Sequence, residues 1–397
     1  MVGVSIEPPP EFTRRGVEHR LFRAGEVERA RAVRAKWELR APSMLAKALN
    51  AQAGTDGDSA NLKRSLREAD APLPENSEWE GWGGRELEPV LASLTLISVP
   101  WLIKFLRGEV MPERKGVIPP WQDLPPAAKV SLQELREAAA GFGDWLPLAI
   151  LSYGWEAKSH PDPHGHLLRR LEPALVSMSS GKGGYMRIIA IAWDFPSLPQ
   201  RGYTLGYNPE QDDRTEYEQK RFGRGLSNIN IPYAHPYVPV LVCDFEMPAG
   251  AENPHSVWVR GWCIFERCLS VVAKVSSCYL HLSLLPEGAA DMNWVEVFMA
   301  CLADRKAPMA ADAFERMMLE GMASGEIIFT NGKDATKVCI PQFQEALLRL
   351  LGTQKKLAYH FLGWGPAEAE QLAEAFLYAQ KMGTAVAAET LNIRDNK

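Results

Sequence analysis

Three short apolar runs, separated by amphipathic and polar stretches, dominate the middle of the chain. They are LPLAILSY at 146–153, RIIAIAW at 187–193 and YVPVLVC at 237–243, each followed by turn-forming or charged residues. Strands that are apolar on both faces are typical of a parallel sheet with helices on both sides. Residues 164–178 carry leucines at helical spacing and complete a strand–helix–strand unit. The pattern therefore predicts an α/β fold with a doubly wound, flavodoxin-like parallel sheet.

A fourth element follows the third run. Residues 259–274, VRGWCIFERCLSVVAK, have helical periodicity and place Trp262, Phe265 and Glu266 on one apolar stripe. This helix ends the predicted core, and we assign the α/β domain to residues 143–285.

Helical patterns flank this domain on both sides. Residues 14–50 are rich in Arg, Glu and Ala at helical spacing, whereas residues 54–84 break every period and predict a mobile stretch. We therefore expect residues 1–140 to form a helical N-terminal region. After the domain, the periodicity predicts a helical extension at 286–365 and a further helix-containing segment at 366–397.

The most apolar stretch of the N-terminal region runs from Val90 to Leu106. It is shorter than the roughly 20 residues that a membrane-spanning helix needs, and it contains Pro100 and Lys104. A buried helix is therefore the simpler interpretation. Pro100 fits the first turn of a helix, where its missing N–H leaves no hydrogen bond unmade.

Composition narrows the classes of partner. The 44 Lys and Arg residues against 49 Asp and Glu give a net charge of -5, so the chain lacks an overall positive field for nucleic acid or an anionic membrane. The six cysteines form no Cys-x-x-Cys pair, which favours a reducing compartment, and the N-terminus lacks the apolar core of a signal peptide. We expect a cytoplasmic protein that binds neither nucleic acid nor a membrane.

Polar and aromatic residues follow the predicted strands. Ligands of open α/β sheets bind at the carboxyl ends of the strands, near the point where the strand order reverses. The first run ends at Ser152, Tyr153 and Trp155, and the second is followed by Asp194 and Ser197. These residues are the candidates for binding a small molecule.

Glu266 lies among the hydrophobic residues of the fourth element. A carboxylate in such surroundings is costly unless it is paired, and desolvation raises its pKa. Glu266 is therefore either a functional carboxylate or one half of a structural ion pair. Arg260, Arg267 and Arg170 are the possible partners in the second interpretation.

A histidine-rich turn, HPDPHGH, precedes the first predicted helix. His160, His164 and His166 stand near Asp162, which suggests a metal site, but the prolines and glycine between them indicate a turn that leads into a helix. We interpret Asp162 as the cap of that helix and expect no bound metal.

The motifs resemble those of TIR domains. ILSYGWEAKSHPDPHGHLLRRL is similar to the opening of a TIR domain, IAWDFPSLPQRG to its second strand and the loop that follows, and RGWCIFERCLSVV to the Trp-Cys-x-x-Glu helix near its end. The related heterokaryon-incompatibility domains share the aromatic first strand and the Arg-Gly-Trp-x-x-x-Glu helix. The resemblance covers about 140 of the 397 residues, and the polar stretch at 200–236 is longer than the corresponding TIR loop.

This resemblance implies a function. Enzymatic TIR domains cleave NAD⁺ with the glutamate of the Trp-Cys-x-x-Glu helix, and here that position is Glu266. NAD⁺ would be the substrate, with no separate cofactor, and Tyr153, Trp155 or Trp262 could stack on one of its rings. Other members of these families act by homotypic assembly. The resemblance therefore favours a signalling or defence protein that either hydrolyses NAD⁺ or self-associates without catalysis.

The end of the chain, TLNIRDNK, fits the LxLxxN core of a leucine-rich repeat at Leu391, Ile393 and Asn396. A single repeat cannot bury its own apolar face, and about three are needed for stability. We interpret residues 366–397 as the start of a repeat array, with a chance match as the alternative. The order of all these motifs also resembles that of a large group of proteins from unicellular algae.

Overall fold

A sheet of mixed direction organises the protein in the computed structural model. The structure describes residues 78–139, 145–182, 185, 187–203, 211–302, 305–360 and 362–396. The strands of the main sheet lie in the order β2-β1-β4-β3-β5-β6. Their bounds are β1 Leu96–Ser98, β2 Lys129–Val130, β3 Leu148–Ser152, β4 Ala190–Ala192, β5 Val240–Val242 and β6 Tyr279–His281. Strands β4, β3, β5 and β6 are parallel, whereas β1 pairs antiparallel with both β4 and β2.

The three predicted strands are confirmed as β3, β4 and β5, and the α/β class is confirmed with them. Ile150 of β3 pairs with Ala192 of β4 on one side and with Val240 of β5 on the other. The order β4-β3-β5-β6 means that the chain first adds a strand on one side of β3 and then continues on the other. It is compatible with a flavodoxin-like sheet, whose ligands bind at this reversal.

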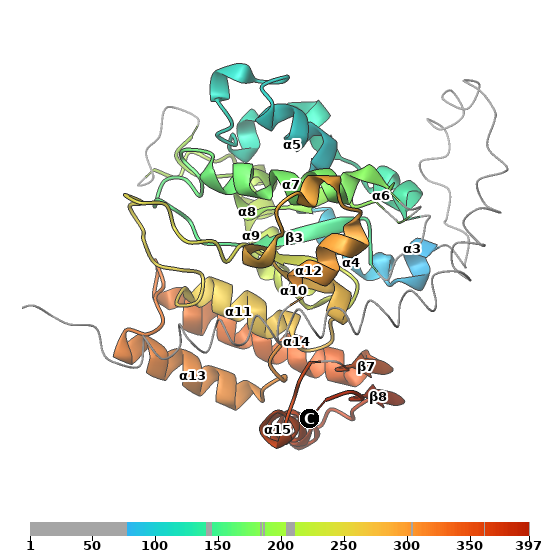
Figure 1. Cartoon of the computed structure of the whole chain (residues 1–397). Coiled ribbons are helices and arrows are strands. Elements are labelled where there is room, and N and C mark those ends of the chain that lie inside the picture. The colour runs from blue at the N-terminus through green and yellow to red at the C-terminus, as the bar shows by residue number, and fades with distance from the viewer. Residues whose placement is uncertain are drawn as a thin grey trace, which may run out of the picture. The chain divides into compact units, whose positions relative to one another are not determined.

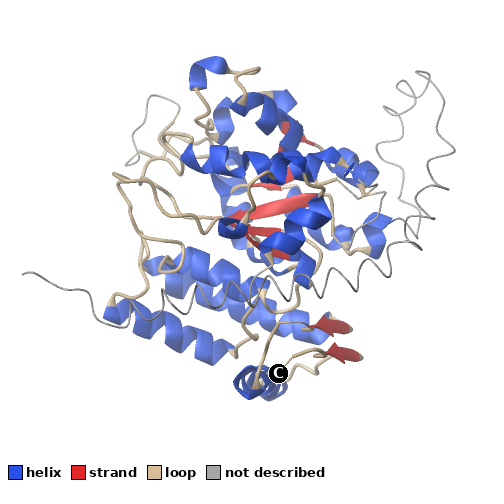
Figure 2. Cartoon of the chain, viewed as in Figure 1, coloured by secondary structure: helices blue, strands red, loops and turns tan. Residues whose placement is uncertain are grey.

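Helices cover both faces of the sheet because the side chains of β3 alternate between two apolar cores (Figure 1, Figure 2). Leu148 and Ile150 face one core, and Ala149 and Leu151 face the other. The helices on the first side are α4 (Gly84–Leu91), α10 (Asn230–Ala234), α11 (Gly261–Ser270) and α14 (Ile340–Thr353). Those on the second are α5 (Val99–Leu106), α7 (His166–Ser180) and α12 (Trp294–Cys301).

The apolar stretch from Val90 to Leu106 is divided among three elements, namely the end of α4, strand β1 and helix α5. Pro100 lies in the first turn of α5, as predicted, and the Ser98 hydroxyl caps the helix by accepting from the Trp101 N–H. In the described part of the chain, no helix is both long enough and apolar enough to cross a membrane.

The remaining helices lie in the flanking segments and in the long insertion before β5. Their bounds are α3 Glu78–Gly81, α6 Leu132–Ala138, α8 Asp194–Ser197, α9 Glu216–Ser227, α13 Ala311–Ser324 and α15 Pro366–Lys381. Helix α3 and the first residue of α4 fall within the stretch expected to be mobile, and the predicted helix at 14–50 lies outside the described residues. The helical patterns predicted after residue 286 are confirmed as α12, α13, α14 and α15.

The C-terminal segment forms a small parallel sheet with a helix between its strands. Strand β8 (Thr390–Asn392) pairs in parallel with β7 (Lys356–Ala358), and α15 connects them. The Asn396 side chain accepts from the main-chain N–H groups of Leu362 and Trp364, and it donates to the carbonyl oxygens of Tyr359 and Ile393. The asparagine of the LxLxxN pattern thus holds the loop after β7. The repeat array stays a prediction.

Candidate functional site

Ser152 and Glu266 meet at the carboxyl end of the central strand. Ser152 ends β3 and has the same side-chain parity as Leu148 and Ile150, so it faces the side of the sheet that α11 covers. Glu266 lies in the second turn of α11. The Tyr233 hydroxyl, from α10, reaches the same place and donates a 2.5 Å hydrogen bond to the Leu151 carbonyl oxygen. Two hydroxyls and one carboxyl group therefore gather beside the tip of β3.

Glu266 has an unusual charge equilibrium. Its pKa is raised to about 8, with burial as the largest cause and the Asp194 charge acting in the same direction, while the nearby Ser152 and Tyr233 hydroxyls and the Arg267 guanidinium lower it. Its Oε2 atom and the Ser152 Oγ atom are both buried, and neither makes an aligned hydrogen bond within the described residues. The two groups are neighbours with spare hydrogen-bonding capacity. Glu266 as a whole is partly exposed, although its Oε2 atom is buried.

The ion-pair interpretation of Glu266 is not supported by the arginines proposed for it. Arg260 donates to the carbonyl oxygens of Trp155, Asn253 and His255. Arg267 donates to the Trp258 carbonyl oxygen and stacks on that ring, and Arg170 donates to the Glu246 carbonyl oxygen. Among the described residues, Glu266 forms no salt bridge within 4.0 Å.

Tyr153, Trp155 and Asp194 form a second cluster next to this carboxyl group. Tyr153 donates a short hydrogen bond from its hydroxyl to Asp194 Oδ1, and the Trp155 indole donates to Oδ2 over 3.2 Å. The Phe195 N–H also donates to Asp194, over 2.6 Å. The loop after β3 and the turn after β4 are therefore joined through one carboxylate.

Asp194 has both an exposed surface and a raised pKa. Its side chain is among the exposed ones, yet desolvation by the surrounding protein raises its pKa against the lowering effect of its three donors. Asp194 and the neighbouring Trp155 therefore present a carboxylate and an aromatic ring at the ends of β3 and β4.

Two glycines allow close packing at the start of α11, Gly154 against the Arg260 side chain and Gly261 against the ring of Phe329. A β-carbon on Gly154 would lie 2.8 Å from Arg260 Nε, and one on Gly261 would lie 2.0 Å from a ring carbon of Phe329. Arg260 is 8% exposed and stands at the N-terminal cap of α11, where its three carbonyl partners fix it. The Cys263 thiol, one turn on, donates to the Tyr153 carbonyl oxygen over 3.1 Å.

Two predicted site residues have other contacts. The Ser197 hydroxyl is buried and accepts from the Trp193 N–H, closing the short helix α8. The Trp262 indole donates to Asp334 Oδ2 over 3.1 Å, in the segment before α14. The structure brings Ser152, Tyr153, Trp155, Asp194 and Glu266 together. It shows no direct contact of Ser197 or Trp262 with that group among the described interactions.

Sequence reasoning noted Asp244 as the polar residue after the third strand, but it missed Tyr233 and the pairing of Asp244 with His281. Tyr233 lies within the insertion at 200–236, which was read only as a long polar loop. His281, at the end of β6, has Nδ1 2.9 Å from Asp244 Oδ2, beyond the end of β5. Burial acts to raise the pKa of Asp244, but its bonds with His281 and Ser283 bring that pKa below the usual value. Like Ser152 and Asp194, Asp244 and His281 lie at the carboxyl ends of parallel strands, so their positions in the sequence could have indicated this pair.

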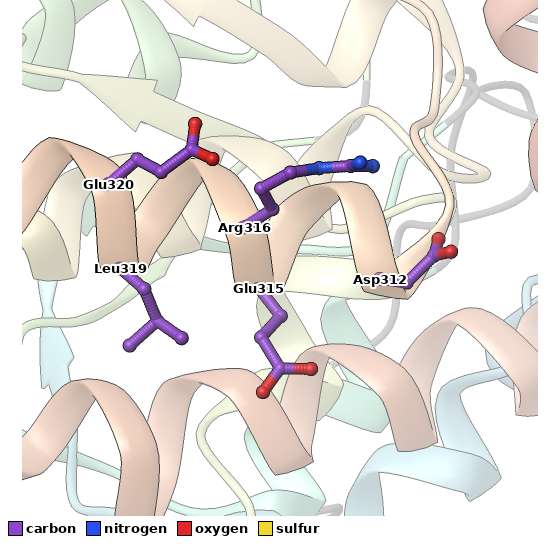
Figure 3. Close-up of a pocket in the computed structure, with 5 residues that line it drawn as sticks. All are labelled: Asp312, Glu315, Arg316, Leu319 and Glu320. Atoms are coloured by element: carbon purple, nitrogen blue, oxygen red, sulfur yellow. The ribbon is translucent and has the colours of Figure 1, made fainter.

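A shallow depression lies on α13, away from the strand ends. It is lined by Asp312, Glu315, Arg316, Leu319 and Glu320, all exposed residues of one helix (Figure 3). Their side chains fan outward from the helix, and no second element contributes to the lining. It lacks the convergent polar groups of a binding site.

Comparison of the chain with protein-family models, with curated proteins and with solved structures found no match.

Proposed function

We propose that this protein hydrolyses the N-glycosidic bond of NAD⁺ or of a related nucleotide, with Glu266 as the catalytic carboxylate. The observation that carries the proposal is the state of this side chain: it belongs to a partly exposed residue, it forms no ion pair with Arg260 or Arg267, and it lies beside the hydroxyls of Ser152 and Tyr233. A structural carboxylate among hydrophobic residues would need a cation. A functional one needs access and room for a ligand.

Cleavage of this N-glycosidic bond needs only one carboxylate. When the bond between the ribose C1′ and the nicotinamide nitrogen breaks, its electron pair neutralises the positive nitrogen, so nicotinamide leaves without an acid catalyst. The ribose becomes oxocarbenium-like, and ionised Glu266 would stabilise it electrostatically. A water molecule then adds its oxygen to C1′ and releases a proton to solvent. Ser152 and Tyr233 would orient the carboxylate or the ribose hydroxyls.

The raised pKa of Glu266 is consistent with a cationic substrate. The positively charged nicotinamide ring favours the ionised form of a nearby carboxylate, so binding would remove the proton that the empty site retains. The carboxylate of Asp194, which belongs to an exposed residue, would add negative charge beside Glu266. Trp155, which donates to Asp194, offers a ring for stacking.

The test is the release of nicotinamide from NAD⁺ by the purified protein at high protein concentration. Glu266→Ala and Glu266→Gln should both abolish release while the unfolding transition stays cooperative. Absence of turnover by the unmodified protein counts against the proposal.

A second candidate function is non-catalytic self-association. It is favoured by exposed apolar side chains in and directly after two consecutive elements. Leu377 lies in α15 and Met382 at its C-cap, and Leu391 lies in β8 with Ile393 directly after it. Sedimentation velocity of the unmodified protein and of Ile393→Asp tests this function. Dimers or larger assemblies that dissociate in the variant support it, and a monomer at all concentrations contradicts it.

A further inference from the structure

Two carboxylates and one imidazole form a cluster in the loop that carries Trp155 and at the start of the helix that follows it. It consists of Glu156, Asp162 and His166, and one ligand atom from each lies within 4.8 Å of the other two. Glu156 and Asp162 belong to the loop between β3 and α7, and His166 is the first residue of α7. None of the three belongs to the Glu266 site.

The backbone holds these side chains in a fixed frame. The Glu156 N–H donates to the Pro161 carbonyl oxygen over 2.9 Å, so the two ends of the loop are tied together. The Asn253 N–H donates to the Glu156 carbonyl oxygen over 2.8 Å. Gly165, with φ +68°, allows the chain to turn into α7 immediately before His166. A cluster preorganised in this way loses little conformational entropy when it binds an ion.

Asp162 caps α7, as predicted. Its Oδ1 and Oδ2 atoms accept from the N–H groups of Leu167 and Leu168 over 3.2 and 2.9 Å. Asp162 is fully buried, so these two main-chain donors fix the position of its carboxylate at the start of the helix. Hydrogen bonds of this kind are the support that metal-binding carboxylates receive in proteins.

Glu156 places a second carboxylate next to that charge. Only 5% of its side chain is exposed, and within the described residues no lysine or arginine forms a salt bridge with it or with Asp162. Its side-chain partner is His166, whose Nδ1 lies 3.4 Å from Oε2. A charge-assisted hydrogen bond would be about 2.7–2.9 Å long. Two buried carboxylates thus face each other without a cation close enough to balance them.

We propose that Glu156, Asp162 and His166 bind a first-row divalent cation, Zn²⁺ or Mn²⁺. Two carboxylate oxygens and one imidazole nitrogen are the donor set that such ions prefer, and an imidazole disfavours Mg²⁺ and Ca²⁺. Metal–ligand bonds of about 2.1 Å separate neighbouring ligand atoms by about 3.0–3.4 Å, which is the spacing between Glu156 and His166. The His166 side chain is 43% exposed and supplies the entry route. The ion would supply the positive charge that Glu156 lacks.

Binding is tested with the metal alone. Full-length protein, stripped with a chelator, is titrated with ZnCl₂ and separately with MnCl₂ by calorimetry, and its melting temperature is followed. At about 100 times the Kd, the melting temperature should rise by roughly 5 °C. Because Mn²⁺ binds thiols poorly, its titration separates this cluster from the cysteines.

Matched variants locate the ion. Glu156→Gln and His166→Gln should each weaken binding by about 10-fold or more, whereas His164→Gln, which alters the exposed neighbour of His166, should leave the Kd unchanged. Glu156→Gln removes a buried charge without removing the helix cap, so it should fold even if Asp162→Asn does not. No binding by the unmodified protein overturns the proposal, and so does equal affinity in all variants. Neither result depends on whether NAD⁺ is cleaved.

Discussion

The Nη1 atom of Arg260 donates a 2.6 Å hydrogen bond to the main-chain carbonyl oxygen of Trp155. Arg260 caps α11, the helix that carries Glu266, and Trp155 lies in the loop at the end of β3. This contact therefore fixes the carboxylate of one element relative to the aromatic ring of another. Because the hydrogen bonds of Arg260 go to main-chain oxygens and a methionine sulfur, Arg260 forms no ion pair with Glu266.

The start of α11 should not tolerate a side chain. In Gly261→Ala the new β-carbon would lie 2.0 Å from Phe329, so the ring or the helix must move, and the free energy of unfolding should fall by about 1–3 kcal/mol. The control is Gly223→Ala in α9, where nothing lies within 4 Å and the free energy of unfolding should rise by about 0.5–1 kcal/mol. Urea unfolding measures both. Equal effects would show that the close approach is unimportant.

Glu266→Gln should stabilise the protein at alkaline pH. The folded-state pKa of about 8 exceeds the unfolded value of about 4.3, so folding favours the protonated form. This contribution is complete below the unfolded pKa and is lost as the pH rises through about 8. The glutamine variant does not titrate, so its advantage over the unmodified protein should grow by about 4 kcal/mol between pH 5 and pH 9.

Urea unfolding of both proteins across this pH range measures the difference. Exposed Glu315 on α13 provides the control, because Glu315→Gln should follow the unmodified protein at every pH. A Glu266→Gln variant that is less stable at pH 9 would indicate that the carboxylate is ion-paired after all.

The titration of Glu266 should also set the pH dependence of catalysis, and activity should rise with pH where stability falls. If ionised Glu266 is required, kcat/KM for NAD⁺ should rise about tenfold per pH unit below pH 8 and level off above it. The profile of kcat should be shifted to lower pH, because the cationic substrate favours the ionised form. Initial rates between pH 5.5 and 9.5 check this, and a kcat/KM that falls with increasing pH would assign Glu266 the role of an acid.

Two tryptophans should respond differently to the same substitution. Trp155→Phe removes the indole N–H that donates to Asp194 and should raise KM for NAD⁺ severalfold. Trp262→Phe removes the bond to Asp334 and should lower the free energy of unfolding by about 1 kcal/mol with KM unchanged. Steady-state kinetics and urea unfolding of both variants test this. A changed KM in Trp262→Phe would return that residue to the binding site.

Much of the fold could be predicted because its central strands are apolar on both faces. β3, β4 and β5 follow from those apolar runs, and α7 and α11 follow from the helical spacing at 164–178 and 259–274. β1 escaped prediction because it occupies three residues of the uniformly apolar stretch from Val90 to Leu106, where neither period stands out. Helix α9 lay in a segment read as a polar loop, although Thr215 and Glu218 form a capping box at its start.

The site could be predicted where it follows the strand ends and, for Glu266, from its place among the hydrophobic residues of the fourth element. Ser152, Tyr153, Trp155 and Asp194 stand there in the sequence, and parallel strands end at one edge of the sheet. Tyr233 arrives from the insertion before β5, and no local pattern indicates that it reaches the tip of β3. The sequence also could not show which groups the three arginines bind. A guanidinium can donate to main-chain oxygens, which every residue supplies.

The most direct test is the time course of nicotinamide release from NAD⁺ at pH 8.5 by the unmodified protein and Glu266→Gln at equal concentrations, with unfolding curves recorded on the same samples. The expected result is many turnovers by the unmodified protein and a rate at least 10²–10³-fold lower in the variant, with its cooperative transition retained. Equal rates in the two proteins, or no release by the unmodified protein, would contradict the assignment of Glu266.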